Sequence, residues 1–557
     1  GFLFLAWCAV LVLAAAVAVR GAAHERAGGE GGAGRSGTLP PVVADPDAAE
    51  RTAAYWVEEA QAEIRARVGG GLAGARGGTE RARRVVMFLG DGMSVPTLAA
   101  ARTLRGQRSG RPGEESRMSF ERFPTVGLAK TYCVNAQIAD SACTATAYLC
   151  GVKNNYATTG VTAAVPRYDC AASLLPDNRV QSIAEWALQE GWDAGIVTTT
   201  RVTHASPSGV YAKVASRNWE NDAEVRADGR DPDACEDIAQ QLVHRSPGNQ
   251  LKVILGGGRR EFLPVDAVDE EGSPGRRTDG RDLLREWRED KAARNLSHRY
   301  VASRTDLLAA AADPPDYLLG LFEGTHMHYN MEAGAATEPS LAEMTEVAIK
   351  MLDRNENGFF LFVEGGRIDH AHHDNLVEFA LDETLEMDAA VQRAVELLDE
   401  EDSLIVVTAD HAHVMAFNGY TRRGGDVLGP SDDRDELDVP YMTLSYTNGP
   451  GWRPHVAGRR VDVTQESNYR AEGWMSHSDA PLDSETHGGD DVAVFAWGAQ
   501  HALFSGLYEQ SHVPHRMAYA ACVGPGERAC SAAPPPASLA HTAAASLLVM
   551  CIALLNH

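Results

Sequence analysis

The sequence predicts an α/β fold: a large, mostly parallel central sheet flanked by helices on both faces. Six apolar runs rich in β-branched residues end abruptly in Gly, Asp, Thr or His, and they cover residues 84–94, 193–206, 251–260, 358–369, 403–413 and 491–498. Their nearly continuous hydrophobicity is typical of strands buried on both faces, as in parallel sheets. Helical patterns separate the runs. In residues 339–353 an apolar face recurs at helical spacing, and Ser340 and Glu343 have the spacing of a capping box.

We interpret both ends of the chain as processing signals. Residues 1–23 form a long apolar run that ends in small residues, as in a secretory signal peptide, with a signal anchor as the alternative. The Gly-rich segment 24–46 is expected to be flexible. At the other end, small residues, a Pro-rich spacer and the apolar tail match a GPI-anchor signal, with a propeptide 532–557 and Ser531 or Ala532 as the attachment residue. Both ends predict secretion and anchoring at the extracellular face of the plasma membrane.

Between these signals we expect one folded domain, residues 47–531. Residues 47–68 have the pattern of an amphipathic helix that precedes the first strand. Residues 419–485 are rich in Gly, Asp, Arg and Pro and break the alternation of strands and helices. We expect this segment to form a small, loop-rich insertion in the domain.

Charge and cysteine content narrow the possible partners and the compartment. The formal net charge of −26 argues against nucleic acid as a partner, because an acidic surface repels a polyanion. Seven cysteines lie outside the two terminal signals, and in an oxidising compartment some of them should pair. Cys522 and Cys530 close a short Gly/Pro loop and form the strongest candidate pair. The sequon at Asn295 is a candidate glycosylation site.

Potential metal ligands stand at the carboxyl ends of the apolar runs, where open α/β sheets bind their ligands. Asp369 and His373 are four residues apart, so a helix would place both on one face. Asp91, Asp410 and His411 are further candidates at the ends of other runs, and His487 is a candidate that precedes the last run. Any single one has roughly even odds of being only a helix cap or a loop hydrogen bond. Several at the edge of one sheet make a metal site the better interpretation.

A nucleophile and an anion clamp are also present. Ser141 stands before a stretch of small residues suited to a packed helix, where backbone N–H groups and the helix dipole favour an anion. Taken by itself, Ser141 is better explained as a helix N-cap. No GxSxG motif accompanies it, and a metal could instead lower the pKa of its hydroxyl group. Arg217 could grip two phosphate oxygens, and Glu364 with Asp91 and Ser206 would suit Mg²⁺.

These residues occur in strings that resemble the successive motifs of animal alkaline phosphatases of the membrane-bound, GPI-anchored type. The strings are GDGMS, ADSACTATAYLCGVK, TRVTHASPSGVYA, SRNW, VILGGGRR, FVEGGRIDHAHH, VTADHAHV and ETHGGDDVAVFAWG. They keep the motif order of that family over about residues 47–531. The resemblance implies a homodimer with two Zn²⁺ and one Mg²⁺ per active site, and it makes 419–485 similar to the crown region at the dimer interface.

The resemblance also implies a role for each candidate residue. Ser141 would be the nucleophile and Arg217 the phosphate clamp. The first zinc would be held by Asp369, His373 and His487. The second zinc would be held by Asp410 and His411 with Asp91 and Ser141. Magnesium would be held by Asp91, Ser206 and Glu364, with His204 close by, while His370 and His372 would be second-shell or structural residues.

Further implied features are a calcium site and disulfides. Calcium would be held by Glu271, the carbonyl of Phe322, Glu323 and Glu338; Glu338 stands where the family has Asp. The disulfides of the family map to Cys170–Cys235 and Cys522–Cys530, and Cys150 maps to an unpaired cysteine. Cys143 replaces a glycine common in mammalian members, and it is expected either to pair with Cys133 or to be a buried thiol.

The function predicted from these residues is metal-dependent hydrolysis of phosphate monoesters, with broad specificity and an alkaline optimum, through a phosphoserine intermediate. Small phosphate monoesters are the expected partners. A phosphodiesterase or sulfatase of the same superfamily is the nearest alternative, although no C-x-P-x-R string occurs in the chain. A metal-binding surface protein without catalysis is the alternative of a different class, and the retained nucleophile, clamp and ligands argue against it.

Overall fold

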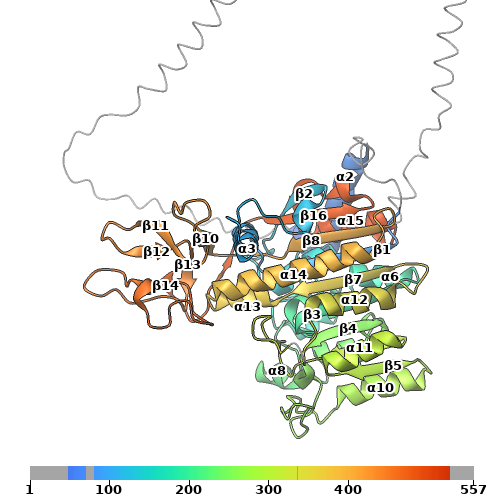
Figure 1. Ribbon diagram of the computed structural model, residues 1–557. Coiled ribbons are helices and arrows are strands. Elements are labelled where there is room, and N and C mark those ends of the chain that lie inside the picture. The colour runs from blue at the N-terminus through green and yellow to red at the C-terminus, as the bar shows by residue number, and fades with distance from the viewer. Residues whose placement is uncertain (1–47, 70–80, 335–336, 527–557) are drawn as a thin grey trace, which may run out of the picture. The chain divides into compact units, whose positions relative to one another are not determined.

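The computed structural model describes residues 48–69, 81–334 and 337–526 (Figure 1). The signal peptide and flexible segment expected over residues 1–46, the attachment residue Ser531 and the propeptide 532–557 lie outside these ranges. In the part of the chain that the structure describes, no helix is long and apolar enough to cross a membrane.

The predicted α/β fold is confirmed. A ten-stranded sheet runs through the domain in the order β17 (Gly506–Glu509), β2 (Thr125–Lys130), β16 (Val492–Gly498), β8 (Ser403–Ala409), β1 (Arg84–Gly90), β7 (Phe359–Gly365), β3 (Asp193–Arg201), β4 (Val253–Gly257), β6 (Tyr317–Leu321) and β5 (His298–Val301). Neighbouring strands are parallel, except that β16 runs antiparallel to β8 and to β2. The sheet is therefore mostly parallel.

All six apolar runs are strands of this sheet; five of them are parallel to one another, and β16 is antiparallel. Four further strands were not identified from the sequence. β2 alternates buried and exposed residues, because one side of it faces solvent. β5, β6 and β17 have only four or five residues, too few to establish a period.

Helices cover both faces of the sheet. Those in the described ranges are α2 (Ala53–Gly69), α3 (Val95–Arg108), α4 (Ser141–Cys150), α5 (Cys170–Ser173), α6 (Ile183–Gln189), α7 (Ala205–Ser208), α8 (Asp222–Ala227), α9 (Ile238–His244), α10 (Leu283–Ala293), α11 (Arg304–Ala312), α12 (Leu341–Leu352), α13 (Arg367–His373), α14 (Val377–Leu397) and α15 (His512–Ala521). α12 and α14 pack on one face of the central strands (Figure 1). α6 packs on the other face with α4 and α15.

Sequence patterns account for these helices locally. The helix expected over residues 47–68 corresponds to α2, which buries Trp56, Ala60 and Ile64 at helical spacing. The capping box of α12 is present: the Glu343 backbone N–H donates to the Ser340 hydroxyl, and the Ser340 N–H donates to the Glu343 carboxylate.

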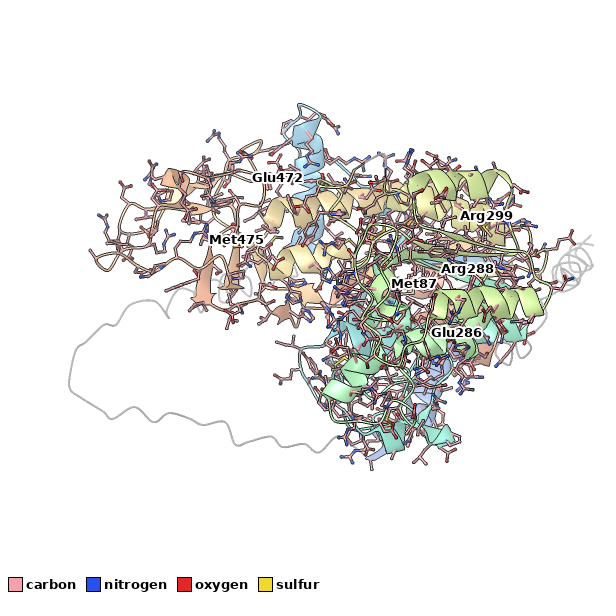
Figure 2. All side chains as sticks on the ribbon, turned by 90° about the horizontal axis from the view of Figure 1, so that it is seen from below. Met87, Glu286, Arg288, Arg299, Glu472 and Met475 are labelled. Atoms are coloured by element: carbon pink, nitrogen blue, oxygen red, sulfur yellow. A yellow bond between two sulfur atoms is a disulfide. The ribbon has the colours of Figure 1, made fainter. Side chains whose placement is uncertain are left out.

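The apolar core follows the central strands. Met87 on β1 is fully buried and lies inside the sheet layer, whereas Glu472 and Met475 lie in the inserted segment at the opposite side of the view (Figure 2). That segment, 419–485, forms small sheets separate from the central one. Their strands are β10 (Met415–Phe417), which directly precedes the segment, β11 (Pro430–Arg434), β12 (Pro440–Met442), β13 (Leu444–Gly449) and β14 (Ser478–Pro481). A separate apolar cluster of Met442, Val463 and Trp474 supports it.

The register of the sheet brings several chain segments to one edge. Gly90, Gly365 and Ala409 are aligned across β1, β7 and β8, so the residues that follow these strands lie side by side. Because β16 is antiparallel, its amino end points to the same edge. The short strand β15 (His487–Gly488), which precedes β16 and pairs with β9 (Ala412–His413), is therefore brought there too.

Candidate metal centre and active site

Ser141 is the first residue of α4, and its side chain does not cap the helix. The cap is Asp140, whose carboxylate accepts hydrogen bonds from the backbone N–H groups of Ala142 at 3.2 Å and Cys143 at 3.3 Å. The reading of Ser141 as a simple N-cap is thus wrong. Its hydroxyl is buried at the positive end of the helix, where an anion would be stabilised.

Three further ligand atoms converge with this hydroxyl. His411 Nε2 lies 3.2 Å from Ser141 Oγ, 3.1 Å from Asp410 Oδ2 and 3.5 Å from Asp91 Oδ1. Four ligands in a tetrahedron around zinc lie about 3.3 Å from one another, given metal–ligand bonds of about 2.0 Å. These spacings therefore suit one zinc ion held by the set predicted for the second zinc.

The geometry does not support a serine–histidine–acid triad. His411 Nδ1 is buried and has no hydrogen-bond partner among the described residues, so no carboxylate orients the ring as a triad requires. Burial also keeps the pKa of His411 well below its ordinary value. A general base that takes the Ser141 proton is therefore not built around His411.

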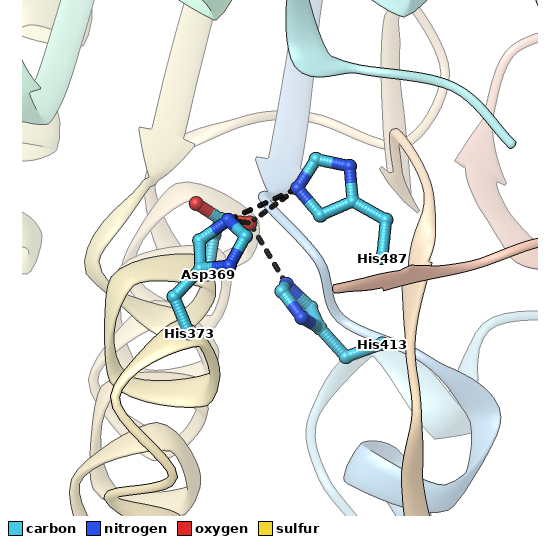
Figure 3. A group of neighbouring side chains, drawn as sticks. All are labelled: Asp369, His373, His413 and His487. Carbon is cyan, nitrogen blue, oxygen red and sulfur yellow. Dashed lines mark hydrogen bonds and ion pairs between the residues drawn. The ribbon is translucent and has the colours of Figure 1, made fainter. Parts of the chain in front are cut away.

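A second group of ligands surrounds Asp369 (Figure 3). Asp369 Oδ1 lies 3.4 Å from His373 Nε2, 3.4 Å from His487 Nε2 and 2.8 Å from His413 Nε2. His373 and His487 also bring their Nε2 atoms to 3.1 Å of each other. α13 supplies Asp369 and His373 from one face, as the spacing of four residues predicts, and β15 supplies His487.

Hydrogen bonds identify which nitrogen of each ring can bind a metal. His373 Nδ1 donates to the carbonyl of Glu485 at 2.5 Å, and His487 Nδ1 donates to the carbonyl of Ala139 at 2.7 Å. A carbonyl only accepts, so the proton of each neutral ring is on Nδ1 and the lone pair is on Nε2. Both lone pairs therefore point at the position shared with Asp369.

His413 is not a metal ligand, although it touches the same carboxylate. Its Nε2 faces Asp369, and its Nδ1 faces the Glu485 carboxylate at 2.5 Å. Burial lowers the pKa of His413, but the charge of Glu485 and the hydrogen bonds to both carboxylates outweigh burial and raise it to about 10. Both nitrogens thus carry protons, and Asp369, His373 and His487 remain as the ligand set predicted for the first zinc.

Buried carboxylates lie close together at the position predicted for magnesium. Burial, together with Asp410, Asp369 and Glu364, raises the pKa of Asp91 well above its ordinary value. Burial likewise raises the pKa of Glu364 to about 7. Glu364 Oε1 is buried without a hydrogen-bond partner, and Ser206 Oγ donates to Asp91 Oδ2 at 3.3 Å. Oxygen ligands with an unsatisfied buried acceptor fit Mg²⁺.

Arg217 links Asp140, the residue before Ser141, to His204. Its Nη1 donates to Asp140 Oδ2 at 3.1 Å, and its Nη2 donates to His204 Nε2 at 3.2 Å. Because a guanidinium only donates, the His204 proton must be on Nδ1. His204 Nδ1 is buried without a partner beside Asp91 and Glu364. His204 is therefore a donor close to the magnesium position rather than a ligand.

Two neighbouring histidines extend this wall of the site. His370 lies against Arg367 and packs its ring 5.3 Å from that of His204. His326, which we did not identify from the sequence, packs 4.3 Å from the ring of His370. His372 points away from the metal position and joins Thr97 to Tyr446, each at 2.9 Å, so its role is structural.

The residues expected to bind calcium lie together only in part. Glu323 and Glu338 share the imidazole of His328, and the pKa of Glu323 is raised to about 7 by burial and by the neighbouring carboxylates of Glu338 and Glu271. Glu271 itself is 41% exposed and lies 3.4 Å from Arg259. Phe322, directly before Glu323, is buried.

The cysteines and the sequon are placed as follows. Disulfides join Cys170 to Cys235 and Cys133 to Cys143. Cys150 is buried and has no disulfide partner among the described residues. The pair predicted for Cys522 involves Cys530, which lies outside those residues. Asn295 is exposed just after α10, where a glycan would have access.

Sequence reasoning missed His413, Glu485 and the threonines that hold Glu364. Thr198 and Thr200 donate to Glu364 Oε2, which fixes this carboxylate at the end of β7. A signal for His413 was present, because it stands two residues after His411 in an extended stretch. The alternation of a strand places residues two apart on the same side, so His413 could have been expected near the same metal positions as His411.

Comparisons with known proteins agree with this geometry. Residues 82–523 match the family model described as alkaline phosphatase. The chain is 61% identical to the membrane-bound alkaline phosphatase of Bombyx mori over 92% of this chain and 93% of the relative. It is 45% identical to the human tissue-nonspecific isozyme over 91% of this chain and 94% of the relative.

Solved structures show the same fold. The alkaline phosphatase of Thermus thermophilus matches with a TM-score of 0.56 at 25% identity, over 82% of this chain and 94% of that one. A mutant of TAB5 alkaline phosphatase with Mg bound in its M3 site matches with a TM-score of 0.55 at 20% identity, over 80% and 99%. The chain belongs to the alkaline phosphatase family and is a phosphomonoesterase.

Proposed function

We propose that this enzyme hydrolyses phosphate monoesters with broad specificity in two steps, through a phosphoserine at Ser141. The observation that carries the proposal is the convergence of Ser141 Oγ with Asp91, Asp410 and His411 at zinc-ligand spacing. Among the described residues, no carboxylate orients His411 as a base toward this hydroxyl, which supports a bound cation as the group that lowers its pKa.

Three cations complete the proposed site: two Zn²⁺ and one Mg²⁺. Asp369, His373 and His487 would hold one zinc; Asp410 and His411, with Asp91 and Ser141, would hold the other; Asp91, Ser206 and Glu364 would hold magnesium. When bound, these ions lower the pKa of hydroxyl groups and water and neutralise the oxygens of the phosphoryl group and the leaving alcohol. The buried carboxylates with raised pKa values support cations here.

The chain's own residues position the substrate. Arg217 presents its guanidinium to two oxygens of the phosphoryl group, and Asp140 holds that guanidinium in place. The positive end of the α4 dipole lies close to Ser141 and favours the negative charge of the phosphoryl group. The residues named grip the phosphoryl group alone, which supports broad specificity toward the alcohol. A water molecule must lose a proton to hydrolyse the phosphoserine, and that proton is lost more readily as the pH rises. This requirement supports an alkaline optimum.

The test compares p-nitrophenyl phosphate with bis(p-nitrophenyl) phosphate. Wild type should turn over the monoester at alkaline pH and lose this activity with a chelator. Ser141→Ala should lower kcat by at least about a thousandfold, whereas Ser173→Ala, a buried serine whose hydroxyl donates to the carbonyl of Cys170, should leave it unchanged. A preference for the diester would favour the phosphodiesterase alternative, and full activity of Ser141→Ala would exclude the phosphoserine.

We further propose the homodimer, the GPI anchor and the extracellular location. On the outer strands, Val126, Leu128 and Leu507 are exposed apolar residues at adjacent register positions, which a second copy would cover. Calcium at Glu271, Phe322, Glu323 and Glu338 is also proposed, supported by the shared position of Glu323 and Glu338. Light scattering of the secreted domain tests the homodimer, and calcium titration of the same domain tests the calcium site.

A further inference from the structure

The Cys133–Cys143 disulfide closes a small covalent ring around the reacting residues. The two cysteines are ten residues apart in the chain, and both are 2% exposed. Cys143 is in the first turn of α4, and Cys133 is in the loop after β2, where it pairs with Ala136 in a short bridge. Ser141 and Asp140 therefore lie inside a ring that has few conformations available.

Three contacts leave this ring toward the active site. Asp140 accepts the hydrogen bond of Arg217 at 3.1 Å. The carbonyl of Ala139 accepts the hydrogen bond of His487 Nδ1 at 2.7 Å, which sets the proton position that leaves Nε2 free. Ser141 itself supplies the hydroxyl beside His411. One covalent ring thus carries the nucleophile, the partner of the clamp and the partner of a metal ligand.

Asp140 joins the ring to the neighbouring loop as well. Its Oδ1 accepts from the backbone N–H of Ala157 at 2.7 Å, besides the caps of α4. A carboxylate with this many fixed donors has one orientation as long as its backbone stays in place. The backbone on its amino-terminal side is a loop, and the disulfide ties the start of that loop to α4.

We propose that the Cys133–Cys143 disulfide is a positioning element of the active site. It holds residues 133–143 as one rigid piece, so that Ser141, Arg217 and His487 keep their relative positions. This inference rests on the proposed roles of those three residues. A disulfide that served stability alone would have no effect on phosphate affinity or zinc retention once the protein is folded.

The Cys170–Cys235 disulfide provides a matched control. It joins residues 65 apart, and its two cysteines form hydrogen bonds with nearby residues of their own loops. In the chain-entropy model, a longer loop loses more entropy on cross-linking, so removal of Cys170–Cys235 should lower stability more than removal of Cys133–Cys143. The two variants therefore separate an effect on stability from an effect on positioning.

The experiment uses the full-length secreted enzyme as Cys133→Ser/Cys143→Ser and as Cys170→Ser/Cys235→Ser. For each, we would measure the thermal midpoint, kcat and KM for p-nitrophenyl phosphate, the affinity for inorganic phosphate by calorimetry, and the rate of zinc loss to a chelator. The Cys133/Cys143 variant should lose zinc about tenfold faster, as expected when the partner of a ligating histidine is displaced. It should also bind phosphate several-fold more weakly and have a lower kcat.

The Cys170/Cys235 variant should show a lower thermal midpoint with phosphate affinity and zinc loss within twofold of wild type. Equal zinc loss and phosphate affinity in wild type and the Cys133/Cys143 variant would overturn the proposal, as would equal changes in both variants. If the double variant is not secreted, Cys133→Ser breaks the same bond and leaves Cys143 in α4. Zinc loss and phosphate affinity need no turnover, so failure of the proposed hydrolysis would show separately, as an inactive wild type.

Discussion

At the scale of single residues, the partners of the ligands matter as much as the ligands. Asp369 receives its fixed orientation from His413, which Glu485 holds from the other side. The same arrangement makes His413 a charged donor instead of a third nitrogen ligand. Residue type alone could not separate His413 from His373 and His487, because the distinction depends on which acceptor faces each nitrogen.

We expect His413→Asn to weaken zinc binding by about 10- to 100-fold, since the Asp369 carboxylate would lose its orienting partner. Activity should fall at limiting zinc and recover in part when zinc is added. Zinc content after dialysis, with kcat/KM measured at several zinc concentrations, would show this. His455→Asn, an exposed histidine in the inserted segment, serves as the control. Unchanged zinc content in His413→Asn would contradict the orienting role.

A single glycine makes the same centre possible. Gly92 has φ of +66°, and a Cβ there would lie 2.4 Å from the His413 ring. Its N–H donates to Asp410 Oδ1 at 2.9 Å. Gly in the GDGMS motif thus allows the backbone after β1 to approach both metal positions.

At the scale of elements, β16 determines where His487 lies. In a parallel orientation its amino end, and His487 with it, would be at the far edge of the sheet. The sequence held a sign of this, because the metal-ligand candidate of this run precedes the strand, whereas in the other runs it follows. Periodicity reports burial and gives no strand direction, so only the pairing of β16 with β8 and β2 settles the point.

α2 is held to α15 by charged contacts as well as by apolar packing. Glu63 accepts hydrogen bonds from Arg516 at 2.9 Å, Arg67 at 2.8 Å and His512. Burial raises the pKa of Glu63, but the hydrogen bond from His512 and the charge of Arg516 outweigh it and lower the pKa to about 2. The contribution to stability is therefore fully present above pH 4.5 and is lost as the pH falls toward 2.

We expect Glu63→Gln to lower the free energy of unfolding by about 1–2 kcal/mol at pH 7, after allowing for the partial exposure of the group. The difference from wild type should shrink below pH 4.5. Urea titrations of both proteins in chelator, from pH 7 to pH 3, would measure it without a contribution from metal loss. Glu58→Gln, exposed on the same helix, should match wild type throughout.

At the scale of the whole molecule, the sheet gathers four carboxylates into a buried space: Asp91, Glu364, Asp369 and Asp410. For Glu364 the pKa is raised from 4.5 to about 7, chiefly by burial. A raised pKa of an acid means that the folded protein binds more protons than the unfolded chain between those pH values. Without cations, the contribution of Glu364 to stability should then fall as the pH rises through this window.

In cation-free preparations, we expect Glu364→Gln to gain stability relative to wild type between pH 5 and pH 8, by on the order of 3 kcal/mol at about 1.4 kcal/mol for each pKa unit of Glu364, because the buried histidines titrate alike in both proteins. The metal-loaded enzyme should show little of this slope, because the ions neutralise the carboxylates. Thermal midpoints of both proteins at pH 5 and pH 8, with and without chelator, measure the effect. Equal slopes with and without chelator would show that these carboxylates do not hold the cations.

The sequence by itself determined the fold class, the chemical types of the ligands and their place at strand ends. These follow from local patterns, because burial on both faces and helical spacing are relations between residues a few positions apart. The tertiary structure alone decided the antiparallel direction of β16, the exclusion of His413 as a ligand and the pairing of Cys133 with Cys143. Each of these depends on which groups packing brings face to face, and a local pattern carries no information on that.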